Sequence, residues 1–246
     1  MRLAGIDLAW KSDKNSTAVA IGELEDNRLR VERIEPNLRG LNELEALFEG
    51  EARLVGVAID GPLIIPNEFR QRECERQLTS DYIRRKVGCH STNLHLYPDA
   101  RSVKLSSYLV SKGFEHLGNV SEGKFQIECY PHPAIVEIFS LPERLKYKKG
   151  SAMEKRFGQI QLCEYLRALE KSRLVSLSIG EKLADYFNAR HINGLTGADL
   201  KTNEDVLDAV ICLYVSALYT KRVPCQLYGT RERGYIYVPK QKCTAQ

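Results

Sequence analysis

Four aspartates occur where the surrounding residues are apolar, and a carboxylate in such a place needs a compensating partner. Asp7 interrupts the first apolar run of the chain, and Asp60 directly follows the apolar run 54–59. Asp205 and Asp208 are three residues apart in a largely apolar segment, so a helix would place both on one face. Carboxylates that converge without a basic partner repel one another unless a divalent cation neutralises them. Because Mg²⁺ and Mn²⁺ prefer oxygen ligands, we expect all four aspartates to bind one of these metals.

Each aspartate also has a purely structural explanation. At the end of a strand, an aspartate often forms a turn or caps the next helix, which would account for Asp60. In the first turn of a helix it interacts favourably with the helix dipole, which would account for Asp205. Neither explanation suits Asp208, which lies a turn further among apolar residues, or Asp7, which lies within a short apolar run. A shared metal site accounts for all four residues.

Two residues beside the predicted strand 125–130 leave alternatives open. Glu128 is either a further catalytic carboxylate, as a metal ligand or a base that orients water, or the partner of a basic residue such as Arg72. His132 stands between two prolines and is either a general acid for a leaving group or a residue of a surface loop. We include Glu128 with the four aspartates in the predicted catalytic set.

The segment 144–156 is strongly basic. It contains six lysines and arginines against one glutamate, with Tyr147 among them. Such a segment would neutralise the phosphates of a nucleic acid, and its aromatic ring would stack on a base; a solvated basic loop is the alternative. Arginines of the preceding polar segment share helical faces and would line the same cleft. The predicted nucleic-acid-binding residues are Arg72, Arg76, Lys146, Lys148, Lys149 and Arg156.

The composition is that of an ordinary globular protein. Of the 246 residues, 43% are hydrophobic and 28% are charged, which excludes a collagen-like, coiled-coil or wholly disordered chain. The net charge of +4 permits a polyanionic partner without requiring one. No apolar run approaches the roughly 18 residues of a membrane helix, and an acidic residue follows the N-terminus too soon for a secretory signal. We therefore expect a cytoplasmic protein that does not enter a membrane.

The cysteines indicate the same compartment. Their number, seven, is odd, and no C-x-x-C pair occurs, which argues against a disulfide scaffold and a structural zinc site. Cys89, His90 and His95 form at most half of a zinc site, because no second half lies at ligand spacing.

The apolar patterns predict an α/β fold in a single domain of residues 1–246. Three runs, 3–8, 17–22 and 29–32, are expected to form consecutive antiparallel strands. Leucines at helical spacing follow them. The run 54–59 is apolar on both faces, which is typical of a central strand between two layers of helices.

The rest of the chain is predicted to add helices. Residues 63–123 are polar, and we expect a mainly helical insertion that packs beside the sheet. A helix is expected at 154–170. Residues 192–202, with two glycines, are expected to form a loop, after which Thr202 or Asn203 caps the helix that carries the last two aspartates.

Six motifs occur in order over nearly the whole chain. They are Gly5-Ile6-Asp7-Leu8-Ala9-Trp10, Asp60-Gly61-Pro62-Leu63, Arg72-x-Cys74-Glu75, Glu128-x-Tyr130-Pro131, Tyr147-Lys148 and Asp208-Ala209. Together they resemble an uncharacterised family, a domain of unknown function, that is predicted to contain RNase H-like nucleases. The two acids three apart on a late helix also resemble the Holliday-junction-resolvase branch of that superfamily.

This resemblance implies a fold and an activity. The fold would be a mixed five-stranded sheet, with the first three strands antiparallel, flanked by helices. The activity would be hydrolysis of phosphodiesters by two metal ions. The long insertion departs from the resolvases and leaves the nucleic-acid substrate open.

Three hypotheses follow for the function. The first is a nuclease that depends on Mg²⁺ or Mn²⁺, with DNA or RNA as its substrate. The second is an ATP-binding phosphotransferase related to sugar kinases and actin, although the chain lacks a second glycine-rich phosphate turn and is short for a duplicated domain. The third is a non-catalytic nucleic-acid-binding protein with a vestigial site, against which the retention of the acids argues.

Overall fold

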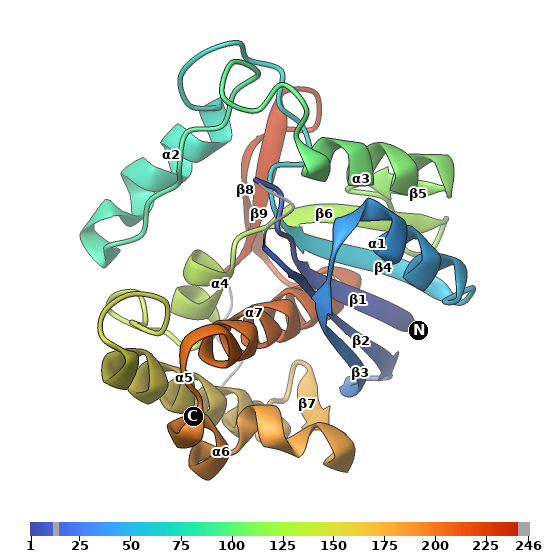
Figure 1. Cartoon of the computed structure of the whole chain (residues 1–246). Helices are drawn as coiled ribbons and strands as arrows, with labels where there is room; N and C mark the ends of the chain where they lie inside the picture. Colours follow the sequence, from blue (N-terminus) through green and yellow to red (C-terminus); the bar gives the residue numbers. More distant parts are fainter. Residues whose placement is uncertain (12–14, 241–246) are drawn as a thin grey trace.

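The computed structural model of the protein describes residues 1–11 and 15–240. Within these residues one sheet of nine strands has helices on both of its faces (Figure 1). The strands are β1 (Arg2–Asp7), β2 (Thr17–Glu25), β3 (Arg28–Leu38), β4 (Leu54–Asp60), β5 (Phe114–His116), β6 (Lys124–Cys129), β7 (Ser176–Ile179), β8 (Cys225–Thr230) and β9 (Gly234–Pro239). Eight of them follow the order β7-β3-β2-β1-β4-β6-β9-β8, and β5 pairs with β6.

All five predicted strands form, and they are neighbours in the sheet. The first three, β1 to β3, are antiparallel, as the sequence predicts, whereas β4 is parallel to β1 and β6 is parallel to β4. The predicted number of strands is wrong, because β5, β7, β8 and β9 enlarge the sheet. The edge strands β7 and β8 consist mostly of half-buried and exposed residues. They therefore lack the continuous apolar run by which central strands are recognised.

Helices cover both faces of the sheet (Figure 1). One face carries α1 (Gly40–Glu49) and α3 (Arg101–Ser111), and the other carries α4 (Pro131–Ile138), α5 (Ala152–Ala168) and α7 (Gly197–Thr220). Every residue of α7 from Asn203 to Leu218 is buried, and this explains why the helix is apolar on all sides. No helix in the described part of the chain is long and apolar enough to span a bilayer.

Helix α7 begins earlier than the sequence predicts. The expected loop at 192–202 is instead the end of α6 (Ala189–Gly194) and the first turns of α7. Its two glycines mark a short break between helices and not a long loop. Thr196 precedes the first turn, so the cap predicted six or seven residues later is wrong. Asp205 consequently lies in the third turn, where interaction with the helix dipole no longer explains it.

The insertion at 63–123 packs beside the sheet but is less helical than expected. It contains α2 (Glu73–Tyr82), the short 3-10 helix η1 (Ile83–Arg85), α3 and the strand β5, joined by extended loops. Helix α2 packs on β8 and β9 through Leu78 and its neighbours. The loops are held by side chains, for example Asn67, whose amide donates to three backbone carbonyl groups. Polar residues that suggest helix surface in the sequence thus fix loop backbone instead.

Gly5 in β1 permits a close approach of α7 to the sheet. A Cβ atom at this position would lie 2.0 Å from the backbone nitrogen of Leu213 and 2.3 Å from the carbonyl oxygen of Ala209. Both atoms belong to the backbone of α7, which has no freedom to move aside while the helix remains packed. The absence of a side chain at Gly5 therefore brings α7, with Asp208, directly onto the strand that ends in Asp7.

Candidate metal centre

Three of the predicted aspartates converge at one edge of the sheet. Asp7 and Asp60 are the last residues of β1 and β4, and they are partners in the parallel register, so their side chains leave the same face. Helix α7 crosses this face and contributes Asp208. One carboxylate oxygen from each residue lies within 4.8 Å of the others. The predicted convergence of these three carboxylates is therefore confirmed, at the edge where ligands of open α/β sheets gather.

The fourth aspartate, Asp205, lies beside this group. Its carboxyl group is hydrogen-bonded to Asp7, and the Nζ of Lys201 donates to it over 2.5 Å. Lys201 also donates to Glu204 over 2.8 Å. Asp205 thus contacts the cluster through Asp7, while its own charge is compensated by Lys201.

The expectation that the acids lack a basic partner is wrong. The Nζ of Lys148 forms an ion pair with the second oxygen of the Asp208 carboxylate. Tyr147 is fully buried, and its hydroxyl donates to the first oxygen of Asp208 over 2.5 Å. The predicted stacking of Tyr147 on a base is therefore wrong, because no face of its ring is accessible. Lys148 lies at the carboxylate cluster and not with the exposed residues of the basic segment.

A glycine of α5 holds this segment against the cluster. A Cβ atom at Gly158 would lie 1.9 Å from the carbonyl oxygen of Lys146, so the chain passes directly over the helix just before Tyr147. A glycine inside an otherwise regular helix is the sequence signal that was missed, since it marks close packing against another segment.

Burial and mutual repulsion raise the pKa of every carboxyl group in the cluster. Burial is the main cause for Asp7, whose pKa rises to about 7, with the positive charge of Lys148 opposing the rise and the negative charge of Asp205 adding to it. Burial also raises the pKa of Asp60 well above its usual range, and that of Asp208. Without a metal the cluster therefore retains protons that a divalent cation would displace.

Asp7 gives the metal-free protein a predictable pH dependence. The folded protein keeps the Asp7 proton up to about pH 7, whereas an unfolded chain loses an aspartate proton at about pH 4. Between these values the folded state binds more protons, so raising the pH lowers the free energy of unfolding. We expect the metal-free melting temperature to fall more steeply between pH 4 and pH 7 in the parent than in Asp7→Asn. Thermal melts at half-unit steps of pH measure both slopes, and equal slopes would mean that Asp7 ionises normally.

Glu128 has the partner that the sequence left as one of its alternatives. It pairs in register with Ile59, so its side chain lies on the opposite face of the sheet from that of Asp60. Two nitrogens of the Arg72 guanidinium donate to its carboxylate over 2.6 and 2.9 Å, and the backbone N–H of Leu63 donates over 2.9 Å. These contacts match the role of ion-pair partner and not that of a ligand in the three-aspartate group.

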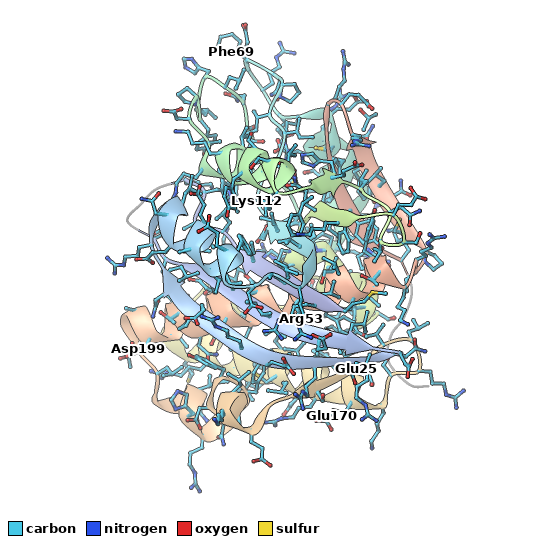
Figure 2. The ribbon with its side chains drawn as sticks, turned by 90° about the vertical axis from the view of Figure 1, so that its right-hand side faces the viewer. Glu25, Arg53, Phe69, Lys112, Glu170 and Asp199 are labelled. Carbon is cyan, nitrogen blue, oxygen red and sulfur yellow. The ribbon has the colours of Figure 1, made fainter. Side chains whose placement is uncertain are left out.

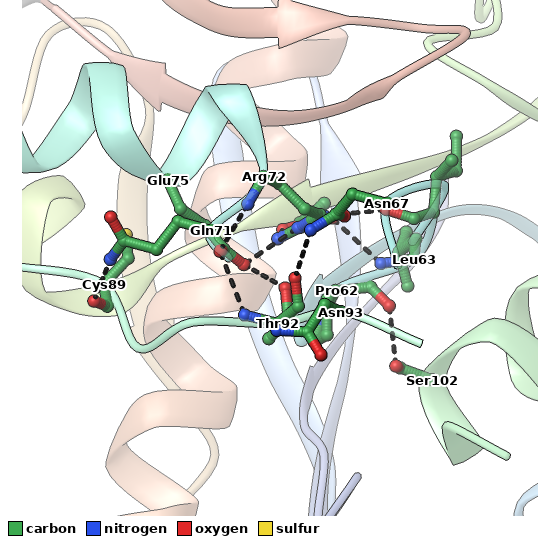
Figure 3. A network of polar contacts seen from close by, with 12 residues as sticks. Pro62, Leu63, Asn67, Gln71, Arg72, Glu75, Cys89, Thr92, Asn93 and Ser102 are labelled. Atoms are coloured by element: carbon green, nitrogen blue, oxygen red, sulfur yellow. Dashed lines mark hydrogen bonds and ion pairs between the residues drawn. The ribbon is translucent and has the colours of Figure 1, made fainter. Parts of the chain in front are cut away.

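Arg72 is the centre of a buried polar network (Figure 3). Besides Glu128, it binds Glu75 over 2.8 Å and the carbonyl oxygen of Ile64 over 3.0 Å. Thr92 donates from its backbone and its hydroxyl to Glu75. Arg72 is only 3% exposed, so the prediction that it contacts phosphates is wrong. It instead fixes the chain that follows Asp60.

A hollow of about 460 Å³ opens beside Asp60 and Lys148. Trp10 lies on its wall, as expected for a rim residue, and packs edge-on against Tyr97. His132 belongs to α4 and also lines the hollow, so it is not a residue of a surface loop. Burial, reinforced by Lys148, holds the pKa of His132 well below its usual range. A neutral imidazole does not suit the predicted role of general acid.

The other predicted nucleic-acid-binding residues are dispersed. Arg76 is exposed on α2, and Lys146 and Lys149 are exposed in the loop before α5. Arg156 donates to the carbonyl oxygen of Leu195 over 2.8 Å and so ties α5 to the start of α7. Of these four residues only Lys149 borders the hollow beside Asp60.

The cysteines take no part in a metal site among the described residues. Six of them are free thiols there, and Cys243 lies outside the described part. The half zinc site suggested by Cys89, His90 and His95 does not form, since the described residues contain one convergent group of ligating side chains, that of Asp7, Asp60 and Asp208.

A mixed α/β fold with an acidic cluster at the carboxyl edge of its parallel strands thus defines this protein. The chain belongs to the family described as "Protein of unknown function (DUF429)", whose model matches residues 5–222. The match spans Gly5, the three aspartates and the Tyr147-Lys148 pair, and so includes the candidate metal centre. A search of the curated proteins gives no match.

Proposed function

We propose that the protein is a nuclease that hydrolyses phosphodiester bonds with the aid of Mg²⁺ or Mn²⁺. The observation that carries this proposal is the approach of three carboxylates, from β1, β4 and α7, to within 4.8 Å of one another. No network of arginines neutralises them, and Lys148 alone compensates Asp208. A cluster of hard oxygen ligands with raised pKa values is suited to bind a divalent cation.

The arrangement of the strands supports an RNase H-like core for this activity. The neighbours β3, β2, β1, β4 and β6 have the order and directions that the resemblance implies, and the remaining strands add to the edges of this unit. Helix α7 packs on the central strands and brings the last acid to the first two. We infer that the larger sheet contains this core.

The residues of the chain divide the chemistry among them. Asp7, Asp60 and Asp208 would hold Mg²⁺ or Mn²⁺, which supplies an activated water and stabilises the charge on the leaving oxygen. The hydrolysis adds water across the P–O bond, leaving a phosphate monoester and a free hydroxyl group. Asp205, hydrogen-bonded to Asp7, is placed to accept the proton that the attacking water loses. Lys148 donates to Asp208 and keeps that carboxylate in place.

The test combines metal binding with hydrolysis. The protein is freed of metal and melted in K⁺, Ca²⁺, Mg²⁺ and Mn²⁺, and is then assayed on single-stranded, duplex and branched oligonucleotides and on bis(p-nitrophenyl) phosphate. At a metal concentration of 100 Kd we expect the melting temperature to rise by about 5–10 °C. Hydrolysis should require Mg²⁺ or Mn²⁺. A melting temperature that no divalent cation raises would contradict the proposal.

A further inference from the structure

A second hollow, of about 620 Å³, lies along α5. Its floor is a stripe of side chains at helical spacing that includes Met153, Phe157 and Tyr165. Phe157 is 70% exposed and Met153 is 74% exposed, although a soluble surface usually covers such side chains. The packing of the described residues does not explain why a phenylalanine occupies this position, and a ligand with a flat apolar face would.

The two hollows adjoin at a basic border. Arg144 and Lys149 line both the hollow beside Asp60 and the hollow along α5. Lys146 is a further exposed cation on the wall of the second hollow. A ligand that reaches the aspartate cluster can therefore continue over these cations to the exposed ring of Phe157.

The acids that line the second hollow do not cancel this charge. Glu143 forms an ion pair with Lys86. Glu154 accepts hydrogen bonds from the N–H and the hydroxyl of Ser151 at the start of α5, over 2.7 and 2.8 Å. Both carboxylates are thus engaged elsewhere, and the cations on the border remain available for an anionic ligand.

Resting on the proposed function, we propose that the substrate is a single-stranded nucleic acid that crosses this border. The scissile phosphate lies beside Asp60, the next phosphates lie on Arg144 and Lys149, and a base stacks on Phe157. An unpaired strand exposes both the backbone charge and the faces of its bases, which suits alternating cations and an exposed ring. In a duplex the faces of the bases are covered by stacking, and the ring of Phe157 would have no base to meet. The size of the first hollow is that of a small-molecule pocket, which admits a single nucleotide and not a helix.

The experiment compares Phe157→Ala with Phe69→Ala. Phe69 is also exposed, at 61%, but belongs to neither hollow and lies at the opposite end of the molecule from Asp199 and Glu170 (Figure 2). Binding of a fluorescent single-stranded 12-mer is measured in Ca²⁺, and hydrolysis of bis(p-nitrophenyl) phosphate is measured in Mn²⁺. We expect Phe157→Ala to weaken oligonucleotide binding about tenfold and Phe69→Ala to leave it unchanged. Neither variant should alter hydrolysis of the small diester, which cannot reach either ring from the aspartates.

Two further results decide the matter. Replacing Lys146 and Lys149 together by alanine should reduce the slope of log K against log salt by about two units. Equal binding of the 12-mer by the parent and Phe157→Ala would overturn the single-strand path, as would binding of duplex DNA that Phe157→Ala weakens equally. Failure of the parent to hydrolyse the small diester would overturn the proposed function instead, and the oligonucleotide measurement would still report on the path.

Discussion

Asp60→Asn should remove metal-dependent hydrolysis, by about a thousandfold or more, without destabilising the metal-free protein. Among the described residues the Asp60 carboxylate has no hydrogen bond or ion pair, so the substitution breaks no contact. Burial and the neighbouring acids Asp7 and Asp208 raise its pKa well above the usual range. A neutral amide in its place therefore relieves repulsion in the absence of metal, and the metal-free melting temperature should be unchanged or higher.

The response to metal separates this expectation from a structural role. Mg²⁺ or Mn²⁺ should raise the melting temperature of Asp60→Asn much less than that of the parent, because one of three ligand charges is missing. Asp199→Asn is the matched control: it removes one negative charge from an exposed position in the first turn of α7 and should keep both the metal response and hydrolysis. If Asp60→Asn melts at a lower temperature without metal and gains as much from metal as the parent, Asp60 is not a ligand.

The acids of the centre could be predicted because each violates a local pattern. A carboxylate inside or directly after an apolar run is visible in the sequence, whatever the fold. The common register of Asp7 and Asp60 then follows from a parallel pair of strands that end together. Their distance from Asp208 depends on Gly5 and on the path of α7, and these are properties of packing that no spacing along the chain reveals.

The charged partners could not be predicted, because the pairs are formed between distant segments. Lys148 belongs to a run of basic residues, which suggests a solvated surface, yet it is 60 positions from the carboxylate that it binds. Arg72 and Glu128 are 56 positions apart. A sequence shows the charge of such residues but not which of them the fold removes from water.

The start of α7 shows a different limit. The two glycines near its N-terminus suggest a loop, but residues buried on every side allow a helix to start immediately after a left-handed glycine. Tertiary packing therefore overrides local propensity there, and the helix gains two turns before Asp205.

Arg72→Met should destabilise the protein by about 3–5 kcal/mol, because it leaves two buried carboxylates without their cation. The side chains of Arg72, Glu75 and Glu128 are each at most 4% exposed, so water cannot replace the lost contacts. At that size the melting temperature should fall by roughly 10 °C or more. Arg76→Met removes the same charge one turn later on α2, from an exposed position, and is expected to leave the melting temperature within about 2 °C of the parent.

A second substitution tests the reason for this loss. Combining Arg72→Met with Glu128→Gln removes one of the stranded charges while keeping an acceptor for the N–H of Leu63, so it should recover part of the lost stability. Glu128 and Arg72 together hold the backbone of Leu63 and Ile64, directly after the strand that ends in Asp60. Arg72→Met should therefore also weaken the response to metal, although Arg72 touches none of the three aspartates. A double variant no more stable than Arg72→Met alone would show that the lost packing of the arginine, and not the uncompensated charge of Glu128, causes the loss.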